Sequence, residues 1–169
     1  MPIAYDVLEA ALAEAVDTSL RQLIAQVDPH DLYAVGLYTG GELSYLALTA
    51  NKRSALNASP SSPWSPPDWA LHLYADESFQ HVNAALLAGW TDDFESFEID
   101  QVRVRQAIHH VLRAARQRFF SETSVVMGLF MGGLDHPWVE TSVEAINPTE
   151  VAQAFISRRR FTLPSDDQE

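Results

Sequence analysis

Apolar residues recur near the start of the chain at spacings of three and four, the period of a helix that buries one face. This stripe ends before Asp28-Pro29, because the residue preceding a proline avoids the helical region. A second strong stripe predicts a helix over about 100–119. Weaker patterns predict one helix or two helical pieces over about 66–88 and a short helix over 151–157. The two strong stripes comprise Val7, Leu8, Leu12, Val16, Leu20, Leu23, Ile24 and Val27, and Val104, Ile108, Val111, Leu112, Ala115 and Phe119.

Two other segments show apolar, strand-like arms joined by glycine-rich turns, a pattern typical of β-hairpins. The first turns at 39–42 and the second at 132–137. Hairpins make antiparallel contacts, so the pattern predicts an α+β fold with a single antiparallel sheet of about four strands. About four helices should pack with it, largely on one face. The predicted strands lie near 32–38, 43–49, 124–131 and 138–143.

Length and composition favour one domain over residues 1–163, followed by a frayed tail over 164–169. The chain has 169 residues, 47% of them hydrophobic, and no cysteine, which excludes disulfides and thiolate chemistry. No apolar run approaches the ~20 residues that span a bilayer, and the N-terminus lacks the pattern of a signal peptide. We therefore expect a cytoplasmic protein that does not bind membranes.

The net charge of -12 makes nucleic-acid binding unexpected, because phosphate contacts need clustered lysine and arginine. Acids interleave with aromatic residues over 90–100, a combination that suits docking of a basic partner. The competing interpretation is a solvated loop whose aromatics pin it to the body. Two tryptophans around a proline turn could add an aromatic platform, although anchoring a loop is their commoner use. The candidate partner-binding residues are Asp92, Asp93, Phe94, Glu95, Trp64 and Trp69.

The tryptophans also carry a packing prediction. Trp69 falls at a predicted helix start and should be mostly buried, whereas Trp64 lies in a proline- and serine-rich loop and should be partly exposed.

The helix over 103–118 is strongly basic, since residues 102–120 hold five arginines and no acid. Four of its residues fall on one side and could hold a phosphate or carboxylate: Arg105, His109, Arg113 and Arg116. The alternative interpretation is that these arginines are solvent-exposed or form ion pairs with nearby acids. The four residues are our alternative site, for a small enzyme or an anionic-ligand binder.

No motif identifies catalytic residues, a metal site or a cofactor. The six histidines lack HExxH or comparable spacing, and the adjacent His109 and His110 point in different directions on a helix. The paired glycines at 40–41 and 132–133 fit tight turns rather than phosphate loops. We expect none of the three.

Four segments together resemble a bacterial family known only as domain of unknown function 4303. They are Leu32-Tyr-Ala-Val-Gly-Leu-Tyr-Thr39, Trp64-Ser-Pro-Pro-Asp-Trp69, Phe119-Phe120 and Ile146-Asn-Pro148. The resemblance implies a single α+β domain and supplies no catalytic residues. Similar small domains are suspected to be immunity proteins encoded beside toxins, so we expect a non-enzymatic binding protein that neutralises a cognate, basic protein toxin.

Overall fold

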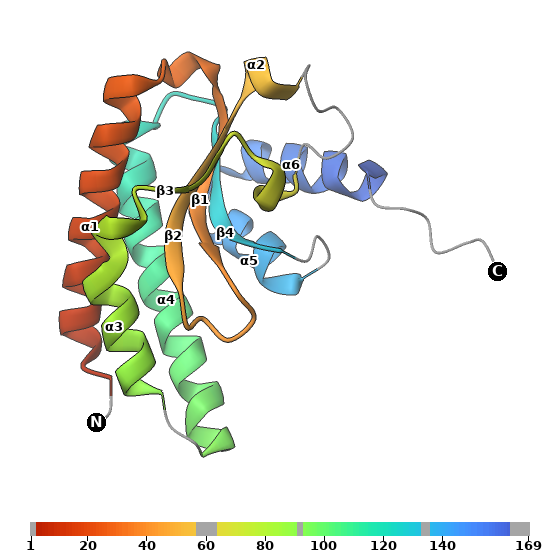
Figure 1. Ribbon diagram of the computed structural model, residues 1–169. Helices are drawn as coiled ribbons and strands as arrows, with labels where there is room; N and C mark the ends of the chain where they lie inside the picture. Colours follow the sequence, from red (N-terminus) through yellow and green to blue (C-terminus); the bar gives the residue numbers. More distant parts are fainter. Residues whose placement is uncertain (1–2, 57–63, 91–92, 133–135, 163–169) are drawn as a thin grey trace.

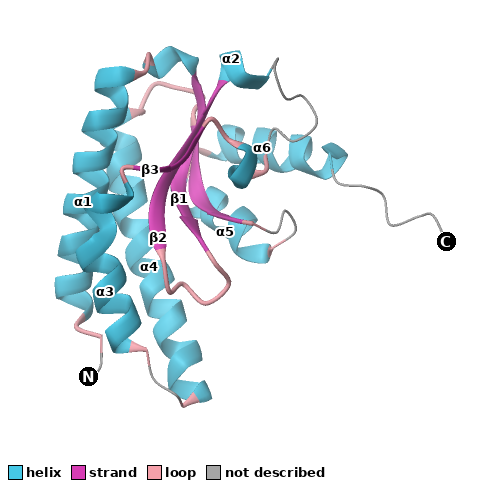
Figure 2. Cartoon of the chain, viewed as in Figure 1, coloured by secondary structure: helices cyan, strands magenta, loops and turns pink. Residues whose placement is uncertain are grey.

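The computed structural model describes residues 3–56, 64–90, 93–132 and 136–162. It has one four-stranded sheet between two layers of helices (Figures 1 and 2). The strands are β1 (Leu32–Thr39), β2 (Leu46–Lys52), β3 (Leu71–Tyr74) and β4 (Val126–Met131). The α-helices are α1 (Tyr5–Gln26), α2 (Arg53–Leu56), α3 (Gln80–Gly89), α4 (Phe94–Phe119), α5 (Pro137–Ile146) and α6 (Thr149–Thr162), with short 3-10 turns at Pro29–Asp31, Pro66–Asp68 and Asp76–Phe79.

The strand order is β3-β2-β1-β4, and the sheet is mixed. The hairpin of β1 and β2 is antiparallel, with Leu37 opposite Leu48, which confirms the first predicted hairpin. The prediction of a purely antiparallel sheet is wrong, because β4 runs parallel to β1, with Gly36 opposite Gly128. The remaining strand of the sheet is β3, which pairs antiparallel with β2.

The second predicted hairpin is wrong because residues 138–143 form part of helix α5. Val139, Val143 and Ile146 are buried at a spacing of four and three, so their apolar face has the helical period. Pro137 occupies the first turn of the helix, where its missing N–H costs no hydrogen bond. The β-branched residues that suggested a strand therefore line one side of a helix.

Other boundaries also differ from the prediction. The region predicted as one helix or two helical pieces over about 66–88 contains β3 before α3, and Leu73 within β3 has a φ of 53°. Residues 94–100, predicted to lie in a loop, are helical because α4 begins at Phe94. The described residues contain six α-helices rather than about four, and these cover both faces of the sheet rather than one.

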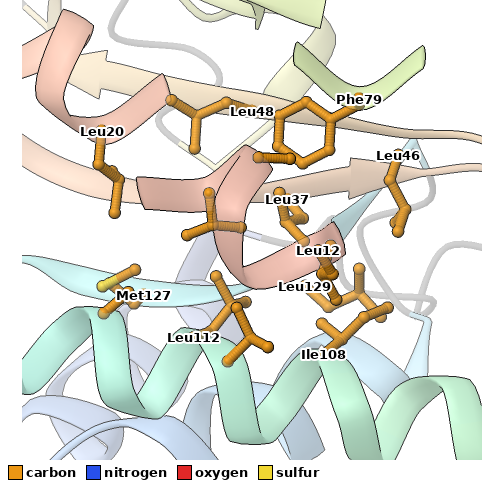
Figure 3. Packing of buried hydrophobic residues seen from close by; sticks show 14 of the residues in the cluster. Leu12, Leu20, Leu37, Leu46, Leu48, Phe79, Ile108, Leu112, Met127 and Leu129 are labelled. Carbon is orange, nitrogen blue, oxygen red and sulfur yellow. The ribbon is translucent and has the colours of Figure 1, made fainter. Parts of the chain in front are cut away.

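The larger core lies between the sheet and the layer of α1, α3 and α4. In Figure 3, Leu12 and Leu20 of α1 and Ile108 and Leu112 of α4 meet side chains from the strands. Leu37, Leu48, Met127 and Leu129 supply the sheet side of this core. The two long stripes seen in the sequence thus pack as predicted, except that Val7 of the first stripe is 69% exposed.

A smaller core covers the opposite face, under α5 and α6. Along β4, Val126 and Phe130 enter this core while Met127 and Leu129 enter the larger one, as the alternation of a strand requires. Burial on both faces explains why β1 and β4 read as nearly continuous apolar runs.

Candidate functional site

The predicted partner-binding residues fall on two separate parts of the fold. Asp93, Phe94 and Glu95 form the start of α4, whereas Trp64 and Trp69 belong to the smaller core beside β1 and α6. Figure 1 shows the start of α4 at the bottom of the view, away from α6. Asp92 lies outside the described residues. The structure therefore does not bring the five described residues of this set into one surface.

Both tryptophans pack against other aromatic rings. Trp69 is 4% exposed and its ring lies 4.9 Å from that of Phe130. Trp64 is half-buried, 5.3 Å from the ring of Tyr33 and 4.7 Å from that of Phe155. These exposures confirm the predicted difference between the two tryptophans. Such edge-to-face contacts anchor the loop onto the sheet.

The start of α4 is exposed. Asp93 caps the helix, because its side chain accepts a hydrogen bond of 2.9 Å from the backbone N–H of Ser96. The side-chain and backbone hydrogen bonds from Ser96 lower the pKa of Asp93. Phe94 is 73% exposed, and Glu95 is exposed beside it. Phe94 and Glu95 are thus open to contact by another molecule, while Asp93 also stabilises the helix.

The basic face of α4 lies against α5 and the turn that follows α4. Its arginine side chains contact other residues of the chain. The guanidinium of Arg105 lies 4.3 Å from the centre of the Trp138 ring. Arg113 donates two hydrogen bonds, of 2.9 and 2.6 Å, to the backbone carbonyl of Ala145 near the end of α5. These contacts hold α4 and α5 together.

Arg116 is only 3% exposed. It donates to the side chain of Asn147 at 3.1 Å, to the carbonyl of Phe120, and to the carbonyl of Thr123 at 3.0 Å. Phe120 caps the end of α4, Thr123 lies in the turn after it, and Asn147 caps the end of α5, so the guanidinium joins the turn after α4 to the end of α5. Burial lowers the pKa of Arg116, and Glu150 raises it in part. The Arg116 side chain therefore has a structural role.

His109 lies between two of these arginines. Burial, followed by the charges of Arg105 and Arg113, lowers its pKa, which favours the neutral imidazole. Its Nε2 atom and the Nε atom of Arg105 are both shielded from solvent without a hydrogen-bond partner. A ligand oxygen would have to displace packed atoms to reach either nitrogen. The geometry thus gives the four residues of the predicted anion site a packing role, and anion binding there stays a prediction.

Hollows also line the seam between α1 and α4, which sequence reasoning did not identify. One, of about 470 Å³, is bordered by Tyr5, Glu9 and Arg103, and a second, of about 220 Å³, by Ala13, Asp17 and Ala114. Glu9 and His110 border both. Three hydrogen bonds or ion pairs between side chains cross this seam in the described part of the chain: Tyr5 donates to Asp100, His110 lies 2.5 Å from Glu9, and Arg118 lies 2.6 Å from Asp17.

Within the described ranges, no three histidine or carboxylate side chains gather closely enough to hold a metal ion. None of the helices in those ranges is both long and apolar enough to cross a membrane.

The family model described as "Domain of unknown function (DUF4303)" matches residues 12–145. No curated protein and no solved structure matches the chain. The matched range extends from α1 into α5 and so includes all four strands.

Proposed function

The chain belongs to the DUF4303 family, and we propose that it is a non-enzymatic binding protein whose partner is a basic protein. The observation that carries the proposal is the exposed start of α4, where Phe94 is 73% exposed beside the carboxylate of Glu95. An exposed aromatic side chain that can be buried by a partner is a common source of binding energy. The neighbouring acids supply the charge that would select a basic surface.

The most concrete form of this proposal is an immunity protein that neutralises a cognate toxin. The net charge of -12 supports it, because a strongly acidic surface accelerates encounter with a basic protein. Such steering raises association rates by roughly 10 to 10³ at low salt, and it weakens as salt screens the charges. Rapid association suits a protein that must bind a toxin before the toxin acts.

The alternative function is that of a small enzyme or an anionic-ligand binder at the arginine-rich helix over 103–118. The row of Arg105, His109 and Arg113 supports it, because these basic groups share one face of α4. Against it, Arg113 and Arg116 already donate to backbone carbonyls. We therefore favour the binding protein.

The test measures binding to the product of the gene encoded next to this one. Glu95 and Glu98 are both exposed, so we would replace them together with lysine. We expect the association rate to fall about tenfold or more at low salt and to become less salt-dependent, with a smaller change in dissociation. Asp93 is left intact because losing its cap would destabilise α4.

The matched control replaces Glu122 and Glu144 with lysine, which makes the same change in net charge at exposed positions distant in sequence from the start of α4. If both double variants slow association equally, only total charge matters and the site is wrong. Alanine variants of Arg113 and Arg116 make poor controls, since both side chains support helix ends. Absence of binding to the neighbouring product at micromolar concentration would remove the immunity proposal.

A further inference from the structure

Exposed apolar side chains are concentrated at one end of the molecule. Six large apolar residues are markedly exposed in the described part of the chain. Only Leu73 of β3 lies elsewhere. The other five lie in the first turn of α1, the last turn of α3 and the first three turns of α4: Val7 (69%), Leu87 (72%), Phe94 (73%), Ile99 (50%) and Val102 (43%). We call this set the helix-end surface.

Two contacts bring these three helix ends together. A Cβ added to Gly89 at the end of α3 would lie 2.3 Å from Cγ1 of Ile3, so α3 ends directly against Ile3, two residues before α1. Tyr5 of α1 donates a hydrogen bond to Asp100 of α4. Figure 1 shows the same convergence at the bottom of the view, where the ends of α1, α3 and α4 lie together.

Packing within the chain covers little of the start of α4. No residue from Phe94 to Arg103 is buried, and the first buried side chain of the helix is Val104. The cap by Asp93 and the ring contact of Trp90 with Phe97, at 5.1 Å, support these turns locally. A helix start that extends past its core, yet carries large apolar side chains, is typical of a surface that another molecule covers.

The charges around this surface select the kind of partner. Asp6, Glu95 and Glu98 are exposed there, and Arg103 is the one base between residues 93 and 103. The guanidinium of Arg103 lies 5.3 Å from the Tyr5 ring. A second copy of this chain would place acids against acids, which opposes self-association. A partner with lysine or arginine beside apolar side chains complements both the negative charge and the apolar character of this surface.

We propose that the helix-end surface is the docking site for a basic amphipathic helix of the partner protein. The partner's apolar side chains would cover Phe94, Ile99 and Leu87, and its cationic side chains would lie near Glu95 and Glu98. This inference rests on the proposed function for the nature of the partner. The inference extends the proposed binding site from the start of α4 to α1 and α3. It excludes Trp64 and Trp69 of the smaller core from that site.

The test uses methyl-labelled protein and two synthetic peptides of about 18 residues, long enough to present one full apolar face. One peptide has leucine and lysine on opposite faces, and the other has glutamate in place of lysine. We expect the lysine peptide to shift the NMR signals of Val7, Leu87, Ile99 and Val102, and the glutamate peptide to bind at least tenfold more weakly.

Variants locate the binding energy. Replacing both Phe94 and Leu87 with serine should lower the affinity for the lysine peptide at least tenfold. Both side chains are more than 70% exposed, so the fold should tolerate the change. The matched control is Leu73→Ser, an exposed apolar residue of β3, which should change affinity less than twofold. Thermal denaturation of each variant checks that the protein is folded.

Several outcomes would overturn the inference. They are no binding at millimolar peptide, signal changes centred on the α1–α4 seam instead, or equal binding of the two peptides. Sedimentation that shows a dimer dissolved by the Phe94→Ser, Leu87→Ser variant would assign the surface to a second copy. The peptide experiment does not need the toxin, so the two proposals fail separately. Peptide binding here without binding of the neighbouring gene product would remove only the immunity proposal.

Discussion

Asn147 closes the outer edge of strand β4, and its replacement with alanine is the sharpest stability test of the fold. Its Oδ1 accepts from the backbone N–H of Met127 at 2.9 Å and from Arg116 at 3.1 Å. Its Nδ2 donates to the carbonyl of Met127 at 2.6 Å and to that of Val143 at 2.8 Å. One amide thus joins the edge strand to the ends of α4 and α5.

The expected cost follows from these four bonds. A hydrogen bond contributes about 0.5–1.5 kcal/mol net, and a partner left buried without one costs more. Asn147 is half-buried, so water can replace part of what is lost. We expect Asn147→Ala to lower the free energy of unfolding by about 2–4 kcal/mol. For a chain of this length that corresponds to a melting temperature lower by about 5–15 °C.

Urea denaturation measures the free energy of unfolding, and hydrogen exchange measures the local effect. The amide of Met127 should lose protection in the variant because its acceptor is gone. Asn83→Ala is the control, since Asn83 makes the corresponding two bonds to Leu46 of β2, at 2.8 and 3.0 Å. It should cost about half as much and leave Met127 protected. An Asn147→Ala variant within about 0.5 kcal/mol of the parent would refute this account of the edge.

Three further predictions concern the close approach of β1 and β4, the smaller core and the buried phenol of Tyr33. Gly36→Ala should destabilise the protein by about 3 kcal/mol or more, seen in urea denaturation, because its Cβ would lie 2.0 Å from the carbonyl oxygen of Gly128; a variant of parental stability would contradict the close approach of β1 and β4. Trp64→Ala should cost about 2–3 kcal/mol in the same assay by removing its contacts with Tyr33 and Phe155, whereas a free aromatic platform would lose almost nothing. Burial raises the pKa of Tyr33 to about 12, so the folded protein keeps this proton where the unfolded chain has lost it. Stability should therefore be intact below the ordinary tyrosine pKa of about 10 and fall as pH rises from there toward 12, and ultraviolet titration showing Tyr33 ionised at pH 10 would disprove it.

The parts of the fold that depend on local pattern could be predicted from the sequence. The stripes of α1 and α4 and the glycine-containing turn between β1 and β2 are all short-range signals. Residues 138–143 show the limit of this approach, since Val139 and Val143 suit either a strand or one face of a helix. The parallel pairing of β1 with β4 has no local signal, because it joins Ala34 to Val126 across most of the chain.

The candidate site was predicted in part. The interleaved acids and aromatics drew attention to Asp93, Phe94 and Glu95, although they were expected in a loop. Val7 was assigned to the core because it adjoins the apolar stripe of α1, and Leu87 was not singled out. Whether an apolar side chain at the margin of a stripe is covered depends on neighbouring helices, which periodicity does not specify.

The pairing of β1 with β4 also determines when the sheet can be completed during protein synthesis. β1 and β2 can form their hairpin early, but the other side of β1 has no partner until β4 has left the ribosome, after the whole of α4. The nascent chain meanwhile has an apolar strand with one open edge, the kind of surface that favours aggregation and recruits chaperones. Factors that delay translation between β2 and β4 should therefore lower the yield of soluble protein more than delays after Met131.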